Sequence, residues 1–164
     1  MHKHINEYGK SESIYVGGSS AGGYLSMMLC FDEKYLAVHK LKPTDFKGYI
    51  LDAGQPTVHF NVLRERGIDT RRIIVDEAAP LYHICEKEYP DMLFIVSDND
   101  MENRFEQTKL MESTLKHFRV DENKYSFLYL KDSTHCSYIR KTTPDGKNMF
   151  ADIAINYINE TENK

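Results

Sequence analysis

The chain has 164 residues, of which 41% are hydrophobic and 28% charged, a composition typical of one soluble globular domain. Its formal net charge of −4, with the basic residues dispersed along the sequence, argues against a nucleic-acid partner. Residues 1–7 lack the apolar core of a signal peptide, and no later stretch is apolar over enough residues to span a membrane. We therefore expect a cytoplasmic protein without a membrane partner.

Cysteine and histidine spacing limits the chemistry further. The three cysteines, Cys30, Cys85 and Cys136, are an odd number without C-x-x-C spacing, which is typical of reduced thiols in a cytoplasmic protein. Paired Cys/His spacings and the H-E-x-x-H motif do not occur in the sequence. We therefore expect neither a metal nor another cofactor.

Short apolar runs alternate with helical patterns along the chain. We expect strands at residues 13–16, 47–52, 92–96 and 125–130, and helices at residues 21–31, 57–66, 102–118 and 148–158. The helix at residues 21–31 is apolar nearly all round, which predicts that it is buried. Residues 71–77 are compatible with one further short helix. Strands that alternate with helices indicate a parallel sheet with right-handed crossovers.

The turn between the first strand and the first helix is rich in small residues. Residues 18–22 are Gly-Ser-Ser-Ala-Gly and fit the pattern G-x-S-x-G. Between a strand and a helix, this pattern needs small neighbours because the chain turns sharply and lifts the serine hydroxyl above the sheet edge. The N-terminus of the next helix offers free N–H groups to a developing oxyanion. Ser20 is therefore the candidate nucleophile, although such a turn can equally cradle a phosphate.

Further polar residues follow strands at the same edge of the predicted sheet, where active sites of parallel sheets gather. Asp52 ends the second predicted strand. Asp98 and Asp100 follow the third strand, and His135 follows the fourth. A nucleophilic serine needs a base within hydrogen-bond reach, and that base needs an acidic partner. The chain order of serine, acid and histidine fits this requirement.

Three segments together carry a family resemblance: residues 18–22, residues 93–100 (LFIVSDND) and residues 133–135 (STH). With these motifs the chain resembles the catalytic, C-terminal part of an α/β-hydrolase of the esterase/lipase type. The resemblance spans nearly the whole sequence. It implies an α/β fold with a mostly parallel sheet of about four strands and flanking helices. It also implies one partial domain over residues 1–164.

The resemblance also implies roles for individual residues. Ser20 corresponds to the nucleophile, His135 to the base and Asp100 to the acid. The acid of this family usually lies at the far end of the turn after its strand, and Asp98 is the competing candidate. The backbone N–H of Ala21 corresponds to one donor of the oxyanion hole. The implied activity is hydrolysis of carboxylic esters with small acyl groups through an acyl-enzyme, and peptide hydrolysis is a close variant.

The chain departs from the family in its first half. A complete α/β-hydrolase has several strands before the nucleophile, whereas fewer than twenty residues precede Ser20. The H-G-G-G motif, which supplies the second oxyanion donor in esterases, does not occur. Losing one such donor costs about a hundred- to a thousandfold in rate. The alternative function is therefore a catalytically impaired hydrolase fragment or an interaction module.

The missing strands would leave the first predicted strand as an unpaired edge of the sheet. An apolar edge favours pairing with another chain. We therefore expect either a truncated product of a longer gene or a homo-oligomer that covers this edge. A third interpretation, a phosphate- or flavin-binding loop at residues 17–23, is disfavoured because the G-x-G-x-x-G order and a P-loop lysine are absent.

Overall fold

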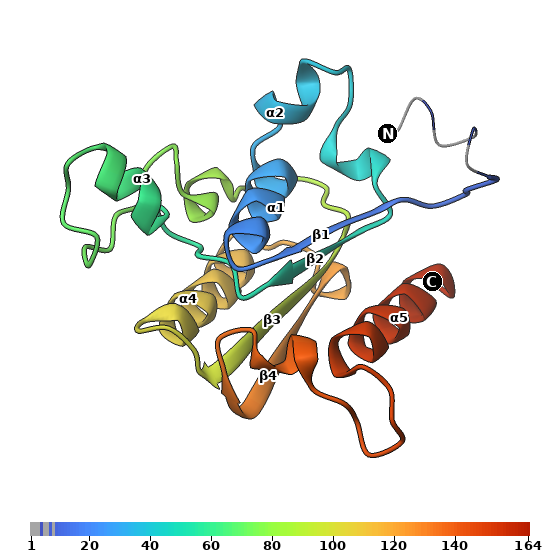
Figure 1. Cartoon of the computed structure of the whole chain (residues 1–164). Helices are drawn as coiled ribbons and strands as arrows, with labels where there is room; N and C mark the ends of the chain where they lie inside the picture. Colours follow the sequence, from blue (N-terminus) through green and yellow to red (C-terminus); the bar gives the residue numbers. More distant parts are fainter. Residues whose placement is uncertain (1–3, 5–6, 8) are drawn as a thin grey trace.

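The computed structural model describes residues 4, 7 and 9–164, in which four strands form one sheet flanked by helices (Figure 1). The strands are β1 (Tyr15–Ser19), β2 (Gly48–Asp52), β3 (Asp91–Asn99) and β4 (Tyr125–Thr134). Neighbouring strands are parallel, in the order β1-β2-β3-β4. The fold class predicted from the sequence is confirmed. The parallel order places the carboxyl ends of all four strands at one edge of the sheet.

Helices cover both faces of this sheet (Figure 1). They are α1 (Ala21–Phe31), α2 (Lys34–Ala37), α3 (Phe60–Glu65), α4 (Arg104–His117) and α5 (Met149–Glu162). α1 and α4 pack against one face, and α5 packs against the other. Because successive side chains of a strand point to opposite faces, Tyr49 and Leu51 of β2 join the core of α1 and α4, whereas Ile50 joins the core of α5.

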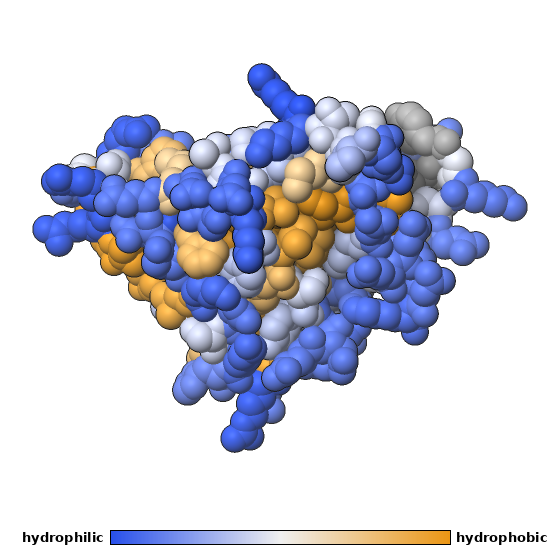
Figure 2. All heavy atoms as spheres, turned by 90° about the horizontal axis from the view of Figure 1, so that it is seen from below, coloured by the Kyte–Doolittle hydropathy of each residue, from blue (hydrophilic) through white to orange (hydrophobic). Residues whose placement is uncertain are grey.

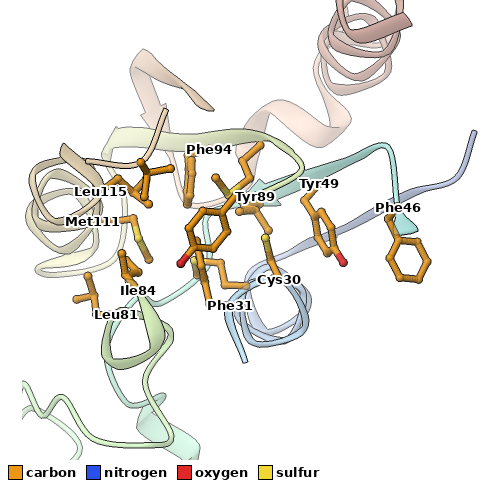
Figure 3. Packing of buried hydrophobic residues seen from close by; sticks show 14 of the residues in the cluster. Cys30, Phe31, Phe46, Tyr49, Leu81, Ile84, Tyr89, Phe94, Met111 and Leu115 are labelled. Atoms are coloured by element: carbon orange, nitrogen blue, oxygen red, sulfur yellow. The ribbon is translucent and has the colours of Figure 1, made fainter. Parts of the chain in front are cut away.

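The larger core lies between the sheet and the helices α1 and α4 (Figure 3). Cys30 and Phe31 of α1 lie in the same cluster as Phe94 of β3 and as Met111 and Leu115 of α4. Burial raises the pKa of the Cys30 thiol, so this cysteine stays protonated and packs as a small apolar side chain. This core fixes the helix after Ser20 and the helix after Asp100 against the same face of the sheet.

Some elements differ from their predicted form. α1 has the predicted bounds and is mostly buried, as expected, but its apolar Leu25 is 59% exposed. The strand predicted at residues 13–16 begins two residues later and continues through Ser19, because its pairing with β2 extends that far. Residues 71–77 form no helix. An extended segment there is held by a hydrogen bond from the Val58 N–H to the Ile74 carbonyl.

β1 and β4 are the two edges of the sheet. Within the described part of the chain, β1 pairs with β2 alone, as expected for the edge next to Ser20. β4 is the lowest strand in Figure 1, and the view from below in Figure 2 shows apolar atoms bordered by hydrophilic side chains. A hollow of about 290 Å³ between β4 and α5 is lined by apolar residues that include Leu128 and Ile153. Among the described residues, no helix is both long enough and apolar enough to cross a membrane.

Candidate active site

Ser20 lies in the tight turn between β1 and α1. Its backbone has φ 58° and ψ −115°, a left-handed φ that is uncommon for a residue with a side chain. The Ser20 N–H donates to the Asp52 carbonyl at 2.9 Å, and the Tyr24 N–H donates to the Ser20 carbonyl at 3.0 Å. These bonds hold the backbone in its strained form. The turn therefore has the geometry of a nucleophile elbow.

Glycines allow the helix to approach the sheet closely at this turn. A Cβ atom at Gly18 would lie 2.5 Å from the backbone of Gly22, and a Cβ atom at Gly23 would overlap the carbonyl oxygen of Asp52. A Cβ atom at Gly22 would meet nothing within 4 Å. The second glycine of the G-x-S-x-G motif therefore contributes through its backbone. Gly18 in the motif and Gly23, one residue outside it, are the positions with no room for a side chain.

Ser20, His135 and Asp100 meet at the carboxyl edge of the sheet. The Ser20 Oγ lies 2.8 Å from His135 Nε2, and His135 Nδ1 lies 2.6 Å from Asp100 Oδ1. The tautomer with its proton on Nδ1 satisfies both contacts, because Nδ1–H then donates to the carboxylate while Nε2 accepts from the serine hydroxyl. The structure thus brings the three candidate residues into one continuous hydrogen-bond chain.

Burial and charge shape the histidine of this chain. The Asp100 side chain is 0% exposed and the His135 side chain 26% exposed. The hydrogen bond to Asp100 raises the pKa of His135 to about 9, with a further contribution from Cys136, against the opposing effect of burial. Asp100 Oδ1 also accepts the Met101 N–H at 2.7 Å, whereas its buried Oδ2 has no hydrogen-bond partner among the described residues. The carboxylate therefore favours a positively charged imidazole beside it.

The competing acid, Asp98, lies elsewhere. Its carboxylate accepts the backbone N–H groups of Asp132 at 3.0 Å and Ser133 at 3.3 Å. These backbone hydrogen bonds lower the pKa of Asp98, the first of them most strongly. Asp98 thus holds the end of β4 that leads to His135, and Asp100 is the carboxylate that contacts the imidazole.

Ala21, the candidate oxyanion donor, is the first residue of α1. Its N–H lies in the first turn, where intrahelical partners are absent, and it has no acceptor among the described residues. The positive end of the helix dipole adds to its capacity to stabilise an anion. Within residues 4, 7 and 9–164, no group of three His, Cys, Asp or Glu side chains could hold a metal ion.

A buried hydrogen-bond network next to the site was only partly foreseen. Asp52, which is 0% exposed, accepts hydrogen bonds from the hydroxyls of Ser19 and Tyr138. Tyr138 is also 0% exposed and lies in the short 3₁₀ helix that follows His135. Asp52 therefore ties the nucleophile turn to the segment after the histidine. The sequence singled out Asp52 as a strand end, but neither hydroxyl carried a signal that could have revealed the network.

Comparison with known proteins identifies the family. The model of the prolyl oligopeptidase family matches residues 3–160. The chain belongs to the prolyl oligopeptidase family. This membership confirms the resemblance to α/β-hydrolases. A search of curated proteins finds no match.

Solved structures share the fold of this prolyl oligopeptidase family member. An esterase from the Planctomycetes species Thermogutta terrifontis, with propionate bound, is 19% identical at a TM-score of 0.66, over 96% of this chain and 60% of the esterase. A truncated carbohydrate esterase from gut microbiota is 15% identical at a TM-score of 0.69, over 99% and 64% of the two chains. Dipeptidyl peptidase 4 from Porphyromonas gingivalis is 16% identical at a TM-score of 0.61, over 99% and 21%. The chain thus spans about 60% of the first of these proteins.

Proposed function

We propose that this chain is a serine hydrolase that cleaves carboxylic esters with small acyl groups, with Ser20 as the nucleophile, His135 as the base and Asp100 as the acid. The observation that carries the proposal is the hydrogen-bond chain from the Ser20 hydroxyl to His135 at 2.8 Å and from His135 to Asp100 at 2.6 Å. Serine is a weak nucleophile without a base in this position. The strained backbone of Ser20 supports the same role.

In the proposed reaction, the Ser20 Oγ attacks the ester carbonyl carbon while His135 Nε2 takes the hydroxyl proton. The carbonyl oxygen becomes an oxyanion and accepts the Ala21 N–H. Asp100 stabilises the imidazolium, which then gives its proton to the leaving alcohol. Water then attacks the acyl carbon while His135 Nε2 takes a proton from it, and His135 returns this proton to Ser20 Oγ as the acyl–oxygen bond breaks and the carboxylic acid leaves.

Covalent labelling tests these roles before any substrate is known. A fluorophosphonate phosphonylates an activated serine, and intact-mass measurement detects the adduct. We expect labelling of the parent chain and none of Ser20→Ala or His135→Ala. The matched controls Ser113→Ala and His117→Ala replace exposed residues at the far end of α4 and should label like the parent. Equal labelling of Ser20→Ala and the parent would contradict the assignment.

The ester preference is supported by the similar esterases, one of which was solved with propionate bound. Peptide hydrolysis is the second candidate, favoured by the family and by the similar dipeptidyl peptidase. Parallel assays with p-nitrophenyl acetate and butyrate and with a dipeptidyl p-nitroanilide separate the two. We expect turnover of the esters, and faster cleavage of the anilide would overturn the ester preference.

A catalytically impaired module remains the alternative to an active hydrolase. The described residues offer one candidate oxyanion donor, and the loss of a second donor costs about a hundred- to a thousandfold in rate. Labelling of Ser20 without measurable ester turnover would support the impaired module. A folded parent chain that does not label at all would overturn the nucleophile assignment.

We also propose that the open edge of β1 pairs with a second copy of the chain. The edge carries apolar side chains that are only half-buried, including Tyr15 and Val16. Exposed strand edges of this kind favour pairing between chains. Sedimentation velocity at micromolar concentration should show a dimer or a larger oligomer. A monomer at these concentrations would overturn this proposal and leave the hydrolase assignment untouched.

A further inference from the structure

A cavity of about 310 Å³ lies next to the turn that carries Asp100. One wall is the segment from Met101 to Arg104, which leads directly from Asp100 into α4. The lining also includes residues 70–73 from the segment after α3. Gln55, three residues beyond the end of β2, also contributes to the lining. The cavity therefore lies at the same edge of the sheet as the candidate active site.

The lining carries an excess of positive charge in a chain whose net charge is −4. Arg71, Arg72 and Arg104 line the cavity together with a single carboxylate, that of Glu102. Arg71 is paired with Asp69 at 2.6 Å. Within the described part of the chain, Arg72 and Arg104 form no ion pair with a carboxylate, and the charge of Asp100 only partly offsets the burial that lowers the pKa of Arg104. Two guanidinium groups thus face the cavity region without a paired anion.

Arg104 is the more unusual of the two because it is only 3% exposed. Its guanidinium donates to the carbonyl of Ala53 and to Gln55 Oε1 at 3.5 Å, and both acceptors are neutral. A guanidinium has five N–H donors, so donors remain beyond these two bonds. A buried cation whose charge is only partly compensated, here by the Asp100 carboxylate, is costly. An anionic ligand in the cavity would offset that cost.

The N-terminus of α4 adds a second source of positive potential. α4 has 14 residues, and its N-cap residue, Asn103, makes no side-chain capping hydrogen bond. The lining includes both Asn103 and Gln107, so the first turn of the helix faces the cavity. The Arg104 N–H is already bonded to the Met101 carbonyl at 2.9 Å and Glu106 adds a negative charge to the first turn, but the helix dipole at such an end still attracts anions. The helix end and the buried arginine therefore favour the same kind of ligand.

We propose that this cavity binds an oxyanion, a carboxylate or a phosphate group, through Arg104, Arg72 and the first turn of α4. Its position links it to the candidate active site: Met101 adjoins Asp100, and Arg104 holds the carbonyl of Ala53 at the end of β2. The role of the bound anion rests on the proposed hydrolase function: the anion is then a group of the substrate itself. The substrate class is then an ester that carries an acidic group away from the bond that is cleaved.

Binding tests the site without any need for turnover. The parent chain is titrated with succinate, with inorganic phosphate and with neutral succinamide in calorimetry. We expect binding of at least one anion and none of succinamide. Tighter binding of succinate than of phosphate would identify a carboxylate site, and the reverse a phosphate site. Absence of binding by both anions would overturn the proposal.

Variants assign the binding to the two arginines. Arg72→Gln changes an exposed side chain and should weaken anion binding about tenfold or more, since the bond to a charged group is lost. Arg104→Gln should weaken it further, and its folding is checked by circular dichroism. Arg119→Gln is the matched control, because it removes the same charge about 20 Å away, beyond the opposite end of α4. Equal binding by Arg72→Gln, folded Arg104→Gln and the control would overturn the proposal.

Substrate selection is tested separately with p-nitrophenyl hemisuccinate and neutral p-nitrophenyl butyrate. We expect Arg72→Gln to lower kcat/KM for the hemisuccinate about tenfold more than it lowers kcat/KM for the butyrate. Equal effects on both esters would overturn the substrate class. Anion binding by a chain whose Ser20 does not label would contradict the proposed hydrolase function and leave the anion site supported.

Discussion

The exchange Tyr138→Phe tests the buried network that joins the two halves of the candidate site. It removes one hydroxyl and keeps the ring in the core shared with α5. Asp52 Oδ1 then loses its donor in a place where both residues are 0% exposed. A hydrogen bond to a charged group contributes about 1.5–3 kcal/mol to stability. In a chain of this length, about 1 kcal/mol lowers Tm by about 2–4 °C, so we expect a fall of about 3–12 °C.

Thermal unfolding followed by circular dichroism measures this fall. Tyr82→Phe is the matched control, because Tyr82 is 60% exposed and the loss of its hydroxyl leaves no buried group without a hydrogen-bond partner. Fluorophosphonate labelling of the folded variant supplies a second readout, and we expect it to slow because Asp52 also holds Ser19 next to the nucleophile. A Tm for Tyr138→Phe equal to that of Tyr82→Phe would refute the role assigned to the network.

Three further predictions concern the site. Because His135 must be neutral to accept a proton, its pKa of about 9 predicts that labelling accelerates as pH rises, with a midpoint above the ordinary value near 6.5. Asp100→Asn should lower this midpoint, and a rate independent of pH between 6 and 10 (about the accessible range) would contradict the assignment. Gly23→Ala should cost about 1–3 kcal/mol of stability because its Cβ overlaps backbone, whereas Gly22→Ala should be tolerated; equal Tm values would contradict this. Asp98→Asn should slow labelling by loosening the loop before the histidine, and an unchanged labelling rate would argue against that role.

The fold could be predicted because it follows from local patterns. Apolar runs that alternate with helical patterns predict a parallel sheet, and α1 has its predicted bounds. The ends of the last two strands could not be predicted in this way. β3 continues to Asn99 and β4 to Thr134 through polar residues, with a shift in register between Ser97 and Asn99. Backbone pairing, which hydrophobicity does not report, extends these strands.

The sequence predicts the candidate site only to the extent that the strand topology determines it. Parallel strands bring their carboxyl ends together, so the sequence could place Ser20, an aspartate and His135 at one edge. The spacing could not choose between Asp98 and Asp100, because that choice depends on which backbone groups lie opposite each carboxylate. The sequence also could not predict side-chain contacts between distant positions, such as the hydrogen bond between Tyr138 and Asp52, which are 86 residues apart.

The contacts that support Ser20, the proposed nucleophile, come from residues that the structure describes. The strained turn at Ser20 is held by the carbonyl of Asp52, and the neighbouring Ser19 is held by its carboxylate. The histidine is held by Asp100. In the proposed mechanism, activation of the serine therefore depends on β1 to β4 and their loops, whereas stabilisation of the oxyanion has one candidate donor, the Ala21 N–H. Labelling by a reactive phosphonate tests the activation of the serine, and ester turnover tests the stabilisation of the oxyanion. Fast labelling together with slow ester hydrolysis would therefore indicate that the oxyanion hole is deficient.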